Sequence, residues 1–173
     1  GVREKFHTAK QDARAMGHFT NGPWHDGKGS PYEGGHRVPF IARWPGQIPA
    51  ASTSEQTICL TDLLATFASI VGAKLPDDAG EDSFDILPAL RDPSLATPIR
   101  PITILQADTK DDVLAVRSGR WKFTESKNGK KKTLYDLTQD VGETKDIAAE
   151  HPEVVKQLSA QLAQAREAGR TRK

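Results

Sequence analysis

The sequence has little cysteine: Cys59 is the only one among 173 residues. A disulfide within the chain is therefore impossible, which is compatible with any cellular compartment. The sequence also lacks an Asn-x-Ser/Thr site for N-glycosylation. Its start has neither an initiator methionine nor the apolar core of a signal peptide, so it is compatible with a processed or truncated piece of a longer protein.

The chain also lacks an excess of positive or negative charge. The chain has 24 Lys and Arg residues against 23 Asp and Glu residues, a formal net charge of +1. This balance gives no electrostatic reason to expect binding to nucleic acid or to an acidic membrane surface. No apolar run is long enough to span a bilayer. The length suits one domain, or a domain with a small subdomain.

One stretch, residues 27–46, combines glycine, charge and an apolar run in the sequence GKGSPYEGGHRVPFIARWPG. It begins as a glycine-rich loop that carries Lys28 and continues as an apolar run over Val38–Trp44, which a Pro-Gly pair ends. Such a run is typical of a strand buried on both faces. Because loops at strand ends often carry the chemistry of α/β proteins, we expect a functional loop that leads into a buried strand.

The residues after this stretch indicate helices. Apolar side chains recur at helical spacing over residues 61–71, with Thr61 as the N-cap and Gly72 as the stop. We expect this helix to cover the sheet, and a short turn or helix to form within Ser83–Leu90. Cys59 is interpreted as a buried thiol at the start of the longer helix.

Turn signals are dense over residues 91–100, where we place a boundary between residues 1–95 and residues 96–173. Beyond it the pattern changes to short strands, with an Asn-Gly hairpin turn at 128–129. An apolar stripe after Pro152 predicts a final helix across one face of an antiparallel sheet. The expected strands are Ile102–Gln106, Val113–Ser118, Trp121–Glu125 and Thr133–Leu137.

The pattern G-K-G-x-x-Y-E-G-G-x-R-V-P-F-I-x-R-W-P-G resembles the loop-and-strand segment of the type I sulfatases, of the alkaline phosphatase superfamily. The likeness continues through an Asp-Leu-Leu-x-Thr helix from Asp62 to Thr66 and a Ser-x-x-x-x-Pro-x-Leu segment from Ser83. Further matching residues are Arg117–Lys122, Leu134–Leu137, Asp140, Glu143, Asp146 and Ile147.

The resemblance implies an α/β fold: part of an alkaline-phosphatase-like α/β sandwich followed by a small C-terminal antiparallel sheet with one helix. Residues 1–95 would be the C-terminal part of the catalytic domain, including the lysine loop. Residues 96–173 would be the sheet-plus-helix subdomain.

Lys28 is the candidate catalytic and substrate-binding residue. A lysine between glycines can hold a compact anion and stabilise a leaving oxygen, because it has three donors and the backbone can approach closely. From composition alone a solvated surface lysine is the ordinary interpretation. The resemblance reverses it, because Lys28 matches the lysine that contacts the sulfate in the family.

Other loop residues have weaker signals. We expect Glu33 and Arg37 to hold the loop by charge-assisted hydrogen bonds rather than to touch substrate. His25 and Trp24 are substrate-binding candidates, since an imidazole can read a sugar hydroxyl and an indole can stack on a sugar ring. His36 is more simply a loop histidine.

The family's nucleophile motif, Cys/Ser-x-Pro/Ala-x-Arg, is absent, because Cys59 is followed by Leu-Thr-Asp-Leu. The paired aspartates of the family's metal site are absent too. Thr20-Asn21-Gly22 resembles the Asp-Asn-Gly metal motif but has Thr for Asp, which a hard cation would not favour. We expect the Asp-Asn pair of the metal motif to lie just before Gly1, which would be its glycine. The less favoured alternative is that Asn21 is a degenerate metal ligand.

The resemblance thus implies the C-terminal portion of a sulfatase that hydrolyses a sulfate ester on a sugar or an aryl group. The complete enzyme would use Ca²⁺ and formylglycine, with neither held by this chain alone, and its partner would be the missing N-terminal portion. A periplasmic, secreted or lysosomal location is implied. The alternatives are a non-catalytic binding or structural chain and a phosphoesterase of the same superfamily. The upstream sequence would distinguish them.

Overall fold

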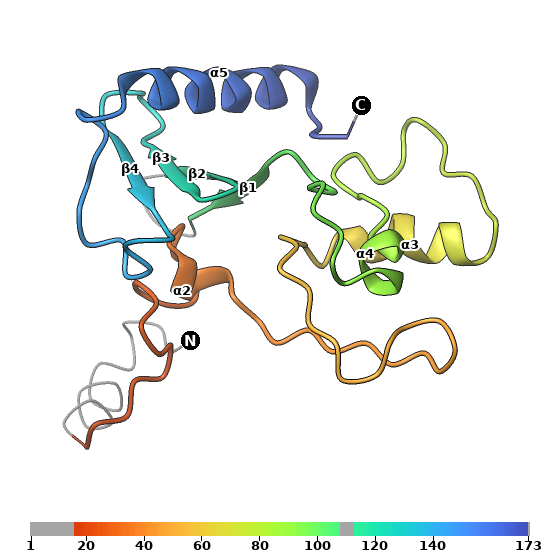
Figure 1. Ribbon diagram of the computed structural model, residues 1–173. Coiled ribbons are helices and arrows are strands. Elements are labelled where there is room, and N and C mark those ends of the chain that lie inside the picture. The colour runs from red at the N-terminus through yellow and green to blue at the C-terminus, as the bar shows by residue number, and fades with distance from the viewer. Residues whose placement is uncertain (1–15, 108–112, 173) are drawn as a thin grey trace. The chain divides into compact units, whose positions relative to one another are not determined.

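The computed structural model describes residues 16–107 and 113–172 (Figure 1). The chain divides into two compact units, each described by itself below. The first unit contains residues 16–38 and 104–162, apart from 108–112, and the second contains residues 39–103 and 163–172. No helix among the described residues is long and apolar enough to cross a membrane.

A four-stranded sheet with the order β1-β2-β3-β4 forms the centre of the first unit. Strand β2 pairs antiparallel with β3, and β3 pairs antiparallel with β4. Gly119 and Gly129, both with positive φ, lie in the two hairpin turns, where a left-handed backbone is needed. The expected strands are confirmed to within one residue at each end. Their bounds are β1 (Thr103–Gln106), β2 (Leu114–Ser118), β3 (Trp121–Glu125) and β4 (Lys132–Asp136).

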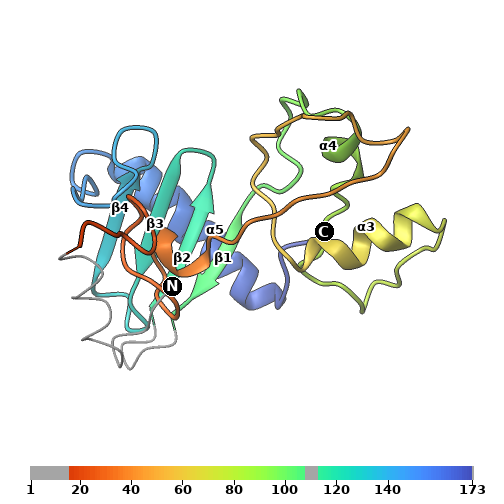
Figure 2. The same ribbon diagram turned by 90° about the horizontal axis from the view of Figure 1, so that it is seen from below.

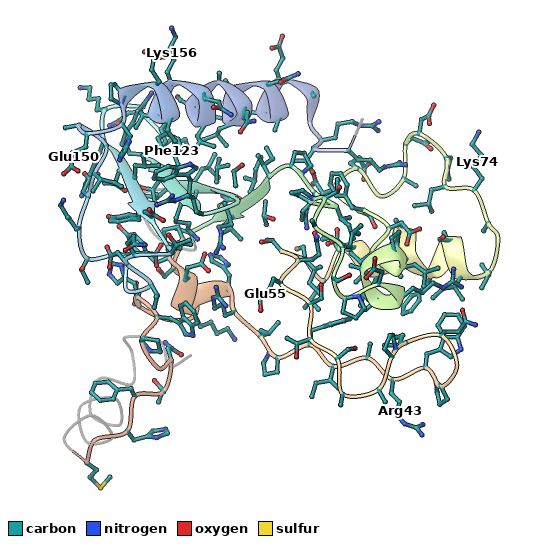
Figure 3. The ribbon with its side chains drawn as sticks, viewed as in Figure 1. Arg43, Glu55, Lys74, Phe123, Glu150 and Lys156 are labelled. Atoms are coloured by element: carbon teal, nitrogen blue, oxygen red, sulfur yellow. The ribbon has the colours of Figure 1, made fainter. Side chains whose placement is uncertain are left out.

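One face of this sheet packs against helix α5 (Pro152–Ala168), whose first residue is the expected proline. The pairing register places Phe123 opposite both Val116 and Leu134, so these side chains share a face. Figure 3 shows Phe123 between the strands and α5, while Lys156 points away from the sheet. The core formed here is fully buried: Val116, Phe123, Leu134, Leu158 and Leu162.

The opposite face of the sheet carries charge. Lys122 is paired with Arg117 on one side and with Tyr135 on the other. Each of these residues is adjacent in sequence to one of Val116, Phe123 and Leu134, so their side chains point to the opposite face. Figures 1 and 2 both place α2 (Glu33–His36) on the side of the sheet away from α5. The loop that leads into α2 therefore lies on the charged face, while the expected helix across the apolar face is confirmed.

The second unit contains helices α3 (Asp62–Ile70) and α4 (Leu87–Arg91), together with the last residues of α5. Asp62 is fully buried, and its carboxylate accepts hydrogen bonds from Arg100 at 3.1 and 3.2 Å. The same carboxylate accepts the backbone N–H groups of Cys59 at 2.7 Å and Phe84 at 3.0 Å. One buried aspartate thus joins the start of α3 to the segments before and after α4.

The prediction of a buried strand over Val38–Trp44 is wrong. Residues 39–102 are all described, and none of them forms a strand. Val38 and Ile41 are 60% and 92% exposed. A strand needs a partner to satisfy its backbone groups and to bury its side chains, and the described residues supply none here.

Helix α3 lies where the apolar spacing predicted a helix, but it does not cover a sheet within its own unit, because residues 39–102 contain no strand. Its apolar side chains Leu64 and Phe67 are exposed. Thr61 occupies the N-cap position without a capping bond, and its hydroxyl donates to the Asp82 carbonyl instead. Cys59 is half-buried rather than buried.

Candidate functional site

Lys28 lies at the tip of a tight turn. The turn is closed by the N–H of Ser30, which donates to the carbonyl of Gly27 at 3.0 Å. Gly29 has φ +91°, a conformation that glycine adopts without strain. Gly27 and Ser30 are buried while Lys28 is exposed. The base of the turn is therefore fixed, and the ammonium group projects from it.

The turn is packed against α2 through glycine backbone. A Cβ on Gly34 would lie 2.5 Å from the His25 carbonyl oxygen and closer still to that of Asp26. A Cβ on Gly35 would overlap the Ser30 carbonyl oxygen. These are backbone atoms that cannot move aside separately, so only glycine allows this approach. The Gly-Gly pair thus brings α2 into direct contact with both flanks of the lysine turn.

Glu33, the first residue of α2, is the anchor of the loop. Its Oε1 accepts a hydrogen bond from Lys122 Nζ at 3.0 Å. Its Oε2 accepts hydrogen bonds from Arg117 Nη1 at 2.9 Å and from Arg37 Nε at 3.0 Å. Lys122 is fully buried and Glu33 nearly so. The expected structural role of Glu33 and Arg37 is therefore present, with strand residues as the further partners.

The charge of Glu33 is stabilised by this cluster. Burial alone would raise the pKa of its carboxyl group, but the positive charges of Lys122 and Arg117 outweigh burial and lower the pKa below its usual value. Glu33 therefore stays ionised at neutral pH. Both of its oxygens accept hydrogen bonds from cations. An ionised carboxylate has no proton to donate, so Glu33 is not suited to act as a general acid.

A second buried carboxylate, Glu143, approaches the same place from the loop after β4. Its Oε2 accepts the backbone N–H of Glu33 at 2.8 Å, and its Oε1 is buried without a hydrogen-bond partner among the described residues. Burial raises the pKa of Glu143 to about 7, although the Glu33 N–H and the Lys122 charge lower it in part. Glu143 is thus a carboxyl group that titrates near neutral pH.

The two substrate-binding candidates lie beside the turn. The ring of Trp24 is half-buried, with the Arg37 guanidinium 3.7 Å from its centroid, so that one face of the indole is already occupied. His25 stacks on Tyr32 at 4.0 Å, and its Nδ1 is buried without a hydrogen-bond partner among the described residues. Burial lowers the pKa of His25, so its imidazole is neutral at pH 7.

Trp24, His25 and Lys28 lie on one short loop before α2. Asn21, the alternative metal ligand, donates its side-chain N–H to the Asp26 carbonyl of the same loop. Among residues 16–107 and 113–172, no group of three or more His, Cys, Asp or Glu side chains is placed to hold a metal ion. Within those ranges, nothing on this loop provides a carboxylate cage for a hard cation.

Sequence reasoning missed Lys122, Arg117 and Glu143 as partners of the loop. A weak signal was available for Lys122, because it lies within a strand between the aromatic residues Trp121 and Phe123. A lysine at such a position needs a buried counter-charge. The sequence does not say which carboxylate supplies it.

The chain resembles known sulfatases along most of its length. The family model described as N-sulphoglucosamine sulphohydrolase, C-terminal, matches residues 22–168. An N-acetylgalactosamine-6-O-sulfatase of Bacteroides thetaiotaomicron is 31% identical over 163 residues, which cover 86% of this chain and 31% of that protein. Arylsulfatase A of Homo sapiens is 35% identical over 162 residues, covering 76% of this chain and 31% of that protein. The chain spans less than a third of the length of these relatives.

Solved structures give the same result. One, from work on the metabolism of multiple glycosaminoglycans by Bacteroides thetaiotaomicron, superposes with a TM-score of 0.78 at 31% identity, covering 91% of this chain and 35% of that one. The crystal structure of Ps i-CgsB in complex with k-i-k-neocarrahexaose superposes with a TM-score of 0.69 at 26% identity, covering 87% of this chain and 33% of that one.

These likenesses fix the fold class. The fold is α/β, part of an alkaline-phosphatase-like α/β sandwich followed by the small antiparallel sheet with α5. The family match covers the lysine turn, its Glu33 anchor and the sheet that holds it. The chain therefore belongs to the N-sulphoglucosamine sulphohydrolase C-terminal family of the sulfatases.

Proposed function

We propose that the complete protein is a sulfatase that hydrolyses a sulfate ester on a sugar, and that this chain supplies the lysine that clamps the sulfate. The observation that carries the proposal is the contrast within one loop. Glu33 and Arg37 are tied into ion pairs, whereas the Lys28 ammonium is exposed and has no hydrogen-bond or ion-pair partner among the described residues. A cation held on a fixed turn with free donors suits an external anion.

The chemistry of the ester explains why such a lysine helps. Cleavage of the S–O bond places negative charge on the leaving oxygen and keeps it on the sulfate oxygens. An ammonium group beside those atoms stabilises the charge that develops in the transition state more than the charge of the ground state. Because the turn is anchored, Lys28 needs little reorganisation to do this.

The cofactors implied for the complete enzyme do not fit the described residues of this chain. Formylglycine would supply the attacking oxygen and Ca²⁺ would hold the sulfate, but Cys59 donates its backbone N–H to Asp62 at the start of α3 and has the wrong sequence around it. No carboxylate cluster for a metal is present in the described ranges. We infer that both groups belong to the missing N-terminal portion, and that this chain alone is inactive.

The substrate is proposed from the relatives and from the loop. One relative is named an N-acetylgalactosamine-6-O-sulfatase, and one structural neighbour was solved in complex with k-i-k-neocarrahexaose. In this chain, the half-buried indole of Trp24 and the neutral imidazole of His25 lie on the same loop as Lys28, and we propose that they contact a sugar beside the sulfate. In this proposal, residues 1–95 complete the catalytic domain and residues 96–173 form the supporting subdomain.

The test is turnover by the full-length protein that carries this chain. We expect hydrolysis of a 6-O-sulfated N-acetylgalactosamine or of an aryl sulfate, and a drop in kcat of about a hundredfold or more for Lys28→Ala with little change in unfolding. Lys74→Ala, an exposed lysine of the second unit, is the matched control and should keep its rate. Turnover of phosphate monoesters alone would indicate a phosphoesterase, and no turnover would indicate a non-catalytic chain.

A further inference from the structure

We propose that Lys122 and Glu33 are positioning residues for Lys28, so that the C-terminal sheet fixes the sulfate-binding turn through one buried ion pair. This inference rests on the function proposed above for Lys28. It assigns a role in that function to the sheet, which would hold the loop that carries Lys28 without touching the substrate itself.

The first link in this arrangement joins the turn to α2. Gly34 and Gly35 lie against carbonyl oxygens of the residues on both sides of Lys28, leaving no space for a Cβ at either position. The Gly34 N–H also donates to the His25 carbonyl at 2.9 Å. Because these contacts are backbone to backbone, a displacement of α2 displaces the turn with it.

The second link joins α2 to the sheet. Glu33 begins α2, and Lys122 is the second residue of β3, with its side chain fully buried. The Lys122 ammonium and the Arg117 guanidinium take different oxygens of the Glu33 carboxylate, at 3.0 and 2.9 Å. Two cations from adjacent strands therefore fix the carboxylate in direction as well as in distance.

Stability alone does not account for a buried lysine in this place. A well-packed apolar side chain of similar size is often as stabilising as a buried ion pair, because both ions must be removed from water. An ion pair with short hydrogen bonds differs from an apolar contact in fixing geometry. A displacement of a catalytic group by about 1 Å can cost about a hundredfold in rate. The geometry is therefore what the Lys122–Glu33 pair contributes.

A double-mutant cycle in the full-length protein tests this role. The kcat and KM are measured for wild type, Lys122→Met, Lys28→Ala and the double variant on the sulfate ester that the wild type hydrolyses. Lys122→Met should lower kcat by about tenfold or more in the wild-type background, but by less than about twofold when Lys28 is already alanine. Equal factors in the two backgrounds would mean that Lys122 acts independently of Lys28, and would overturn the proposal.

Removal of a buried cation can also unfold the sheet, so a second variant is needed. Arg117→Gln weakens the same carboxylate contact from a partly exposed position, with a side chain that is 18% accessible. If Lys122→Met does not fold, as judged by thermal unfolding, the Arg117→Gln cycle decides by the same criterion. Lys145→Met, which removes an exposed ion pair with Glu150 at 2.9 Å, is the control and should keep its kcat.

The outcomes separate this inference from the proposed function. If the wild type hydrolyses no sulfate ester, or if Lys28→Ala keeps its kcat, the proposed function fails and the positioning role fails with it. If Lys28 matters while folded Lys122 and Arg117 variants keep their kcat, only the positioning role fails.

Discussion

The carboxylate of Glu143 accepts a hydrogen bond from the backbone N–H of Glu33 at 2.8 Å, although 110 residues separate the two. Both side chains are buried, and both lie in the electrostatic field of Lys122. Their pKa values move in opposite directions, because Glu33 has direct cationic partners on both oxygens and Glu143 has none on its Oε1. This pair links the lysine loop to the segment after β4 and makes that link sensitive to pH.

The first prediction concerns Glu143→Gln. The pKa of Glu143 rises from 4.5 in the unfolded chain to about 7 in the fold. Its contribution to stability is therefore complete below pH 4.5 and is lost as the pH rises through about 7. The variant should match wild type at about pH 4 and be more stable at about pH 8.5, by on the order of 3 kcal/mol.

Urea unfolding of both proteins across this pH range measures the difference. Asp140, Lys122 and Glu33 interact electrostatically with Glu143, so the difference between the two curves measures the loss of Glu143 together with its coupling to these neighbours. Parallel pH profiles for the two proteins would show that Glu143 does not titrate within the window.

The second prediction concerns Gly34→Ala. The added Cβ would overlap the carbonyl oxygens of His25 and Asp26, and α2 and the lysine turn would have to separate. We expect a loss of about 1–3 kcal/mol in stability, as for other overpacked sites, and faster hydrogen exchange at the Ser30 amide that closes the turn. Gly142→Ala is the control, since its Cβ would meet other atoms only at 3.4 Å or beyond. Unchanged exchange at Ser30 in Gly34→Ala would contradict the close contact.

The third prediction concerns Asp62→Asn in the second unit. The substitution removes the charge that pairs with Arg100, whose side chain is only 3% accessible, and leaves a buried guanidinium without a counter-charge. Breaking such a pair costs about 3–5 kcal/mol of stability. Glu150→Gln, which breaks an exposed pair with Lys145, should change stability by less than about 1 kcal/mol. Similar unfolding midpoints for the two variants would show that the Asp62 network contributes little.

The parts of the fold that the sequence predicted are those in which the local pattern decides the structure. Strands β2 and β3 pair in antiparallel register across a turn that contains Gly119. Helix α5 begins at Pro152 and carries an apolar stripe. Val38–Trp44 has the composition of a strand, but strand formation depends on a partner, which is a non-local condition.

The candidate site divides along the same line. Lys28 could be chosen from its glycine flanks and the family pattern, because both are sequence features. Lys122 could not be paired with Glu33, since the ion pair forms only when β3 and α2 come together across 89 residues. The titration of Glu143 was also beyond sequence reasoning, because burial by tertiary contacts raises its pKa.

The last prediction is that the isolated 173-residue chain associates with itself through residues 38–72. Large apolar side chains are exposed along this segment, among them Ile41 at 92% and Val71 at 76%. Exposed apolar surface together with unpaired backbone favours association. By contrast, residues 101–168 bury the core of the sheet and α5, so we expect stronger protection of their amides.

Sedimentation and hydrogen exchange of the isolated chain test this. We expect a concentration-dependent increase in mass, reduced by Ile41→Lys, and fast exchange over Val38–Trp44 in the monomer at high dilution. Lys156→Ala, on the outer side of α5, should leave the association unchanged. Association is expected only if the exposed apolar side chains of residues 38–72 are buried by another molecule rather than by this chain. Uniformly strong protection across Val38–Trp44 in a proven monomer would therefore show that the chain closes its own core and needs no further part of a sulfatase to do so.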